Sequence, residues 1–201
     1  MLKWIGAGLL GFATLFGGIA CAAAADTVPV EEVDGATQDS SVRHTSPVVI
    51  RSKDIETFRL RFEFSDDVGT DDAARERYPA GRYDLCLEKA EGGARCRIEW
   101  WDRFGDRRRT EFVADASALA RLDALLKEHD VAQIDGHSVW NSALGDDMSL
   151  EVRYESGETI RADGQGGDVK PDPRYYREEW FIDFFRKLGR KYQQDVLEGI
   201  A

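Results

Sequence analysis

An aromatic-rich segment near the C-terminus reads Asp172-Pro173-Arg174-Tyr175-Tyr176-Arg177-Glu178-Glu179-Trp180-Phe181-Ile182-Asp183-Phe184-Phe185-Arg186-Lys187-Leu188-Gly189. Asp172 is suited to cap a helix, Pro173 to its first position and Gly189 to its end. Burial of one such aromatic side chain contributes about 1.5–3 kcal/mol, so this segment predicts a helix packed on a sheet. The predicted apolar face consists of Tyr176, Trp180, Phe181, Phe184, Phe185 and Leu188.

Segments in which apolar and polar residues alternate predict the strands of that sheet. A leucine stripe that begins at Leu119 predicts a first helix, which Asp115 or Ser117 caps and which ends near His129. The predicted fold class is α+β, with an antiparallel meander of about four strands and a second hairpin packed against two helices. The Arg and Glu residues on the strands indicate that the opposite sheet face is open to solvent or to a partner. The alternating segments are 58–64, 82–89, 95–101, 107–113, 148–154 and 160–162.

Two short turns predict the register of the hairpins. A two-residue turn at Glu91-Gly92 pairs the apolar faces of the flanking strands, and Glu155-Ser156-Gly157 suits a three-residue turn with glycine in the left-handed region. The predicted pairs are Leu87–Cys96, Leu85–Ile98, Tyr83–Trp100, Val152–Ile160 and Leu150–Ala162.

The overall charge disfavours one class of partner. The 201 residues carry a formal net charge of −11, whereas nucleic-acid binders usually present a basic surface, so we expect no nucleic acid. The glycine-rich loop 163–170 fits neither phosphate-binding motif and contains two aspartates. We expect no cofactor and no metal.

Residues 1–25 resemble an export signal, with Lys3 ahead of an uncharged run that ends in four alanines. Three outcomes are open: cleavage after Ala25, lipidation of Cys21 in a lipobox-like Gly18-Ile19-Ala20-Cys21, or retention as an anchor. Each places the folded part outside the cytoplasm, either in the periplasm or tethered to the membrane. We expect a polar linker over residues 26–53, one domain over 54–190 and a tail over 191–201.

Two arguments disagree on whether Cys86 and Cys96 form a disulfide. Export favours a disulfide between them. The register above places them on opposite faces, while a bridge needs Cβ atoms about 3.5–4.5 Å apart. From the sequence, both alternatives stay open.

A partner surface is predicted around an arginine run. Trp101, Phe104, Arg107, Arg108 and Arg109 would form a cation–π surface for an envelope protein or an anionic polymer. The alternative is a solvated strand face on which the arginines pair with neighbouring carboxylates.

The chain contains no evident catalytic set, so the leading functional hypothesis is a non-enzymatic binding or interaction module of the cell envelope. The competing hypothesis is a hydrolase of envelope substrates. It would use His137 with Asp135, Asp146 and Asp147, the polar cluster around a histidine in the second half.

Several short motifs between Leu119 and Leu188 carry a resemblance. They include Ile134-Asp135-Gly136, the segment from Met148 to Tyr154, Ser156-Gly157 and Pro173-Arg174-Tyr175-Tyr176. In this layout the chain is similar to a broad group of uncharacterised bacterial exported proteins, many of them lipoproteins. The resemblance implies export and the order of strands and helices, and it supplies no catalytic residue.

Overall fold

The computed structural model describes residues 48–64, 77–140, 147–166 and 170–198. The predicted export segment with Cys21, most of the predicted linker, and Asp146 lie outside these residues.

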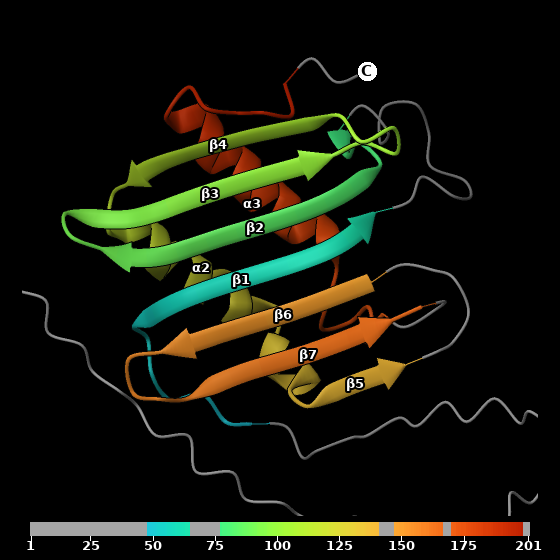
Figure 1. The fold of residues 1–201 in the computed structure, drawn as a ribbon. Helices are drawn as coiled ribbons and strands as arrows, with labels where there is room; N and C mark the ends of the chain where they lie inside the picture. The colour runs from blue at the N-terminus through green and yellow to red at the C-terminus, as the bar shows by residue number, and fades with distance from the viewer. Residues whose placement is uncertain (1–47, 65–76, 141–146, 167–169, 199–201) are drawn as a thin grey trace, which may run out of the picture. The chain divides into compact units, whose positions relative to one another are not determined.

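Seven strands form one sheet in the order β4-β3-β2-β1-β6-β7-β5 (Figure 1). Neighbouring strands are antiparallel except β5 and β7, which run parallel. Two helices pack against this sheet, which confirms the predicted α+β fold. The strands are β1 (Ile55–Phe64), β2 (Gly81–Ala90), β3 (Gly93–Trp101), β4 (Arg107–Ala114), β5 (His137–Trp140), β6 (Asp147–Tyr154) and β7 (Thr159–Gln165).

Both hairpin registers are confirmed. Gly92 and Gly157 adopt positive φ values of 79° and 86° in the two turns, as these tight connections require. The observed partners include Leu87–Cys96, Leu85–Ile98, Tyr83–Trp100, Val152–Ile160 and Leu150–Ala162.

The first strand lies in the middle of the sheet. β1 pairs with β2 on one side and with β6 on the other, so Leu60 contacts both Leu85 and Leu150 across the strands. This arrangement brings the second hairpin beside the first strand, although about 90 residues separate them in the sequence. It creates the part of the sheet on which the candidate site lies.

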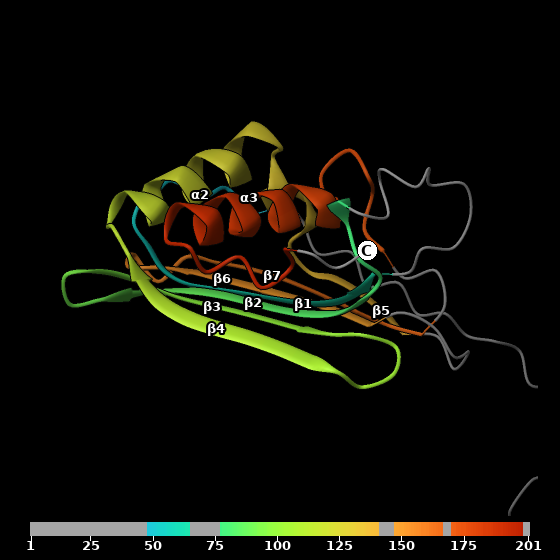
Figure 2. The same cartoon turned by 90° about the horizontal axis from the view of Figure 1, so that it is seen from above.

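Both helices cover the same face of the sheet, and the other face carries no described helix (Figure 2). Phe181 is fully buried, and its ring lies 5.5 Å from that of Phe58 on β1. Phe185 contacts the same ring at 5.8 Å, so the aromatic helix packs on the central strand. The helical elements are α2 (Ser117–Glu128), the short 3-10 helix η1 (Val131–Ile134) and α3 (Glu178–Lys191). Within the described ranges, no helix is both long and apolar enough to cross a bilayer.

The aromatic helix begins later than predicted. Asp172 does cap a turn, because its carboxylate accepts the backbone N–H of Arg174 and its carbonyl accepts those of Tyr175 and Tyr176. Arg177 then adopts an extended backbone (φ −145°, ψ 131°), which ends this turn, so α3 starts only at Glu178. Tyr176 is nevertheless buried, with its ring 5.9 Å from that of Phe181.

The packed domain is longer at both ends than predicted. Val48 and Ile50 pack against the core at the N-terminal end, inside the range predicted as linker. At the other end, Leu197 is buried and the carboxylate of Asp195 binds Arg186 and Arg190 of α3. Residues 192–198, predicted as part of a tail, therefore fold against the sheet and α3.

Candidate functional site

Cross-strand pairing aligns two rows of polar side chains on the uncovered face of the sheet. Residues paired across neighbouring strands point to the same face. The first row is Arg61, Ser149, Asp163 and Ser138, and the second is Asp147, Gln165 and Trp140.

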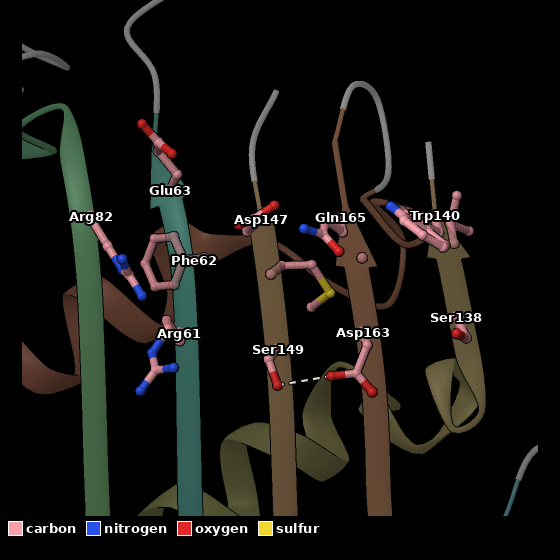
Figure 3. Close-up of a pocket in the computed structure, with 13 residues that line it drawn as sticks. Arg61, Phe62, Glu63, Arg82, Ser138, Trp140, Asp147, Ser149, Asp163 and Gln165 are labelled. Carbon is pink, nitrogen blue, oxygen red and sulfur yellow. Dashed lines mark hydrogen bonds between the residues drawn. The ribbon is translucent and has the colours of Figure 1, made fainter. Parts of the chain in front are cut away.

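A cavity of about 530 Å³ lies over these rows at one end of the sheet. Glu63, Asp147, Gln165 and Trp140 stand near the ends of four neighbouring strands, with Ser149, Asp163 and Ser138 one row below (Figure 3). Arg82 on β2 and Arg61 on β1 line its other side. Side chains from five strands therefore converge on one hollow.

The polar groups of the cavity differ in how they are already bound. The Ser149 hydroxyl donates to Asp163 over 2.8 Å, and the Arg61 guanidinium lies 3.0 Å from Asp84. Glu63 and Asp147 make no side-chain hydrogen bond or ion pair to the part of the chain that the structure describes. Trp140 is 67% exposed. The cavity thus offers two carboxylates and an indole that the described fold does not use.

Metal binding finds no support in the described ranges, where no group of three or more His, Cys, Asp or Glu residues is arranged to hold an ion.

The predicted partner surface lies elsewhere, at the β3–β4 end of the same sheet. Arg107 and Arg109 both contact the carboxylate of Glu99, and Arg107 also lies over the ring of Trp101 at 5.4 Å. Arg108 points to the helix-covered side and donates to the backbone carbonyls of residues 196 and 198. Phe104 is 80% exposed in the intervening loop. Arg107 and Arg109 therefore pair with carboxylates, as the alternative predicts, whereas Arg108 binds backbone carbonyls.

The two cysteines are free thiols on opposite faces of the β2–β3 hairpin. Cys86 pairs with Arg97 on the uncovered face, while Cys96 pairs with Leu87 in the core. Of the two alternatives that the sequence left open, the structure has the free thiols that strand alternation favours. Burial raises the pKa of both thiols, and raises that of Cys96 furthest.

Both thiols are expected to be alkylated only slowly in the folded protein, because they are buried and the thiolate is the reactive form. Once the protein is unfolded without reductant, N-ethylmaleimide should modify Cys86 and Cys96 completely. Peptide mass mapping of unreduced and reduced samples measures this. A cross-linked peptide containing both cysteines in the unreduced sample would contradict the free-thiol assignment.

The residues of the predicted hydrolase do not share a face. His137 pairs with Ala162 on the helix-covered side, whereas Asp147 pairs with Gln165 on the uncovered side. The Asp135 carboxylate accepts the backbone N–H of Arg161 over 2.8 Å and so joins the loop before β5 to β7. Within the described residues, this set supplies no nucleophile, base and orienting group around one point.

The sequence did not predict the cavity, and it did not predict that Trp140 lines it. The alternation correctly indicated which strand residues face away from the helices. It contained no information that β6 lies beside β1, and the four residues of β5 are too few to show a period. The one available signal is Trp140 itself, a large aromatic residue in a short polar segment.

A scan of the chain against protein-family models found no match, and a search among curated proteins found no similar sequence. The proposed function therefore depends on the geometry of the cavity.

Proposed function

We propose that this protein is a non-enzymatic binding module of the cell envelope and that the cavity above β1, β6, β7 and β5 is its ligand site. The observation that carries this proposal is that the exposed Trp140 and the unpaired carboxylates of Glu63 and Asp147 line one cavity of about 530 Å³.

The cavity has the size of a ligand site. Ligand sites are concave, typically about 300–1,000 Å³, with a few polar groups that fix the orientation of the ligand. Tryptophan is among the residues that contribute most to binding, because it buries a large rigid surface with little loss of entropy. The strands also provide a rigid frame, which limits the entropy lost on binding.

The envelope location rests on the sequence of residues 1–25, which resembles an export signal. In this proposal the module acts in the periplasm or on a membrane tether at Cys21, and its partner is an envelope component.

The arginine run is not our proposed contact surface. Arg107 and Arg109 already pair with Glu99, Arg109 also pairs with Glu111, and Arg108 binds the C-terminal backbone. An anionic partner would have to displace these contacts before it could bind there.

Backbone-amide NMR tests the ligand site. The protein is titrated with a panel of small anionic, neutral and cationic ligands, and the shifted amides are mapped. We expect shifts in residues 138–140, 147–149 and 163–165, and we expect Trp140→Ala to weaken that binding by at least threefold, or about 0.6 kcal/mol. Phe104→Ala is the matched control, since it removes another exposed aromatic ring. Shifts gathered at residues 101–109, or none at the cavity, would contradict the proposal.

A further inference from the structure

The charges on the uncovered face fall into two unlike groups. In the first group carboxylates pair with arginines: Asp84 binds Arg61 and Arg97, while Glu99 binds Arg107 and Arg109. Glu151 on β6 likewise binds Arg153 and Arg161. The carboxylates of the cavity are Glu63, Asp147 and Asp163. None of these three has a described cation within 4 Å, although Asp163 accepts a hydrogen bond from Ser149.

The two arginines of the cavity do not cancel this negative charge. Arg61 is compensated by Asp84 at 3.0 Å. Arg82 stands opposite Glu63 in the register, but its guanidinium lies over the ring of Trp101 at 5.8 Å. With Arg61 paired, three carboxylates face one remaining cation, and the whole chain carries a net charge of −11. A negative potential of this kind favours a cation and opposes an anion.

Trp140 supplies an independent preference of the same sign. Trp140 on β5 lies in one cross-strand row with Gln165 on β7 and Asp147 on β6. No described aromatic ring or cation stacks on its indole. The face of an indole attracts a cation by about 0.5–2 kcal/mol, depending on how far the pair is removed from water. An exposed indole in line with Asp147 can therefore hold an ammonium or guanidinium group from two sides.

We infer that the ligand of this cavity carries alkylammonium or guanidinium groups, which bind between the Trp140 ring and the carboxylates of Asp147, Asp163 and Glu63. This inference rests on the proposed function, because it assumes that the cavity is the ligand site. The volume exceeds what one ammonium group fills, so the site suits a short polycation. Such groups occur on lysine- or arginine-rich peptide segments and on free polyamines.

Titration calorimetry with defined probes tests the charge of the ligand. The probes are blocked trilysine, spermidine, blocked triserine and citrate, each added to the purified protein at low and at moderate salt. We expect trilysine or spermidine to bind, more weakly as salt rises, while triserine and citrate do not. Preference for trilysine identifies a peptide source, and preference for spermidine a polyamine source.

Matched variants locate the binding. Trp140→Ala and Asp147→Asn should each weaken binding about threefold to thirtyfold, the range of one cation–π or ion-pair contact of about 0.6–2 kcal/mol. Phe104→Ala and Asp106→Asn change the same residue types in the exposed β3–β4 loop and should leave the affinity unchanged. Thermal unfolding of all four variants checks that the fold is intact.

The outcomes separate this inference from the function on which it rests. Trilysine that binds the cavity and control variants equally would reveal diffuse attraction to an acidic surface and overturn the inference. Triserine or citrate binding that Trp140→Ala abolishes would overturn the cationic ligand class while keeping the cavity as a binding site. If no probe binds and the NMR panel leaves the cavity amides unshifted, the proposed function is contradicted as well.

Discussion

Replacement of Phe181 by alanine is expected to lower the free energy of unfolding by about 3–5 kcal/mol, the usual range for a buried phenylalanine. Phe181 on α3 is fully buried, stacks on Phe58 of the central strand at 5.5 Å and lies 5.9 Å from the ring of Tyr176. Its removal leaves a cavity between helix and sheet and takes away both ring contacts. Because domains of this size are stable by only about 5–15 kcal/mol, this loss is a large fraction of the total.

Urea unfolding followed by circular dichroism measures the change. Phe104→Ala is the control, because its ring is 80% exposed and should contribute less than about 0.5 kcal/mol. A Phe181→Ala variant that lost less than about 1 kcal/mol would show that α3 does not depend on this contact.

Local patterns predicted those parts of the fold whose partners are close in sequence. In the β2–β3 hairpin, the turn at Glu91-Gly92 and the alternation of apolar residues fix one register, so the pairing of Tyr83 with Trp100 follows from the sequence alone. The same reasoning placed Cys86 and Cys96 on opposite faces. Neither conclusion needs information from outside the hairpin.

Pairings between distant segments could not be obtained in this way. Nothing in β1 identifies β6 as its second neighbour, and the parallel pairing of β5 with β7 depends on where the chain returns after α2. The cavity depends on such contacts, because Glu63 on β1 and Trp140 on β5 join the β6–β7 hairpin only through them. The face of Glu63 was predictable from the alternation along its strand, whereas the face of Trp140 and the convergence of these residues were not.

The arginine run is the opposite case. Arg107, Arg108 and Arg109 are conspicuous in the sequence, yet each is engaged within the fold. On the edge strand β4, their charges also oppose edge-to-edge pairing with another chain, a structural role that needs no ligand. Trp140 is less conspicuous in sequence but is 67% exposed beside a hollow. Our proposed site therefore rests on Trp140, which the described fold leaves unused, and not on the arginine run.

Replacement of Asp195 by alanine is expected to destabilise the protein by about 3–5 kcal/mol, because it breaks a buried ion pair from one side. The Asp195 side chain is 2% exposed and lies 3.4 Å from the guanidinium of Arg186, which is itself 10% exposed. Asp195 also accepts the backbone N–H of Leu197 over 3.1 Å, so it holds the C-terminal segment in place. Without this carboxylate, Arg186 keeps a buried positive charge whose remaining acceptor among the described residues is the carbonyl of Arg77. Urea unfolding of the variant measures the loss.

Two further variants distinguish this effect from general damage to the C-terminal segment. Arg190→Ala removes the other partner of Asp195, at 2.9 Å, but Arg190 is 58% exposed, so we expect a loss of at most about 1 kcal/mol. The double variant Arg186→Met/Asp195→Ala removes both buried charges and should be more stable than Asp195→Ala alone, since no uncompensated charge remains. If Asp195→Ala were as stable as the wild type, residues 192–198 would behave as the tail that the sequence predicted, and the buried pair would contribute nothing to the fold.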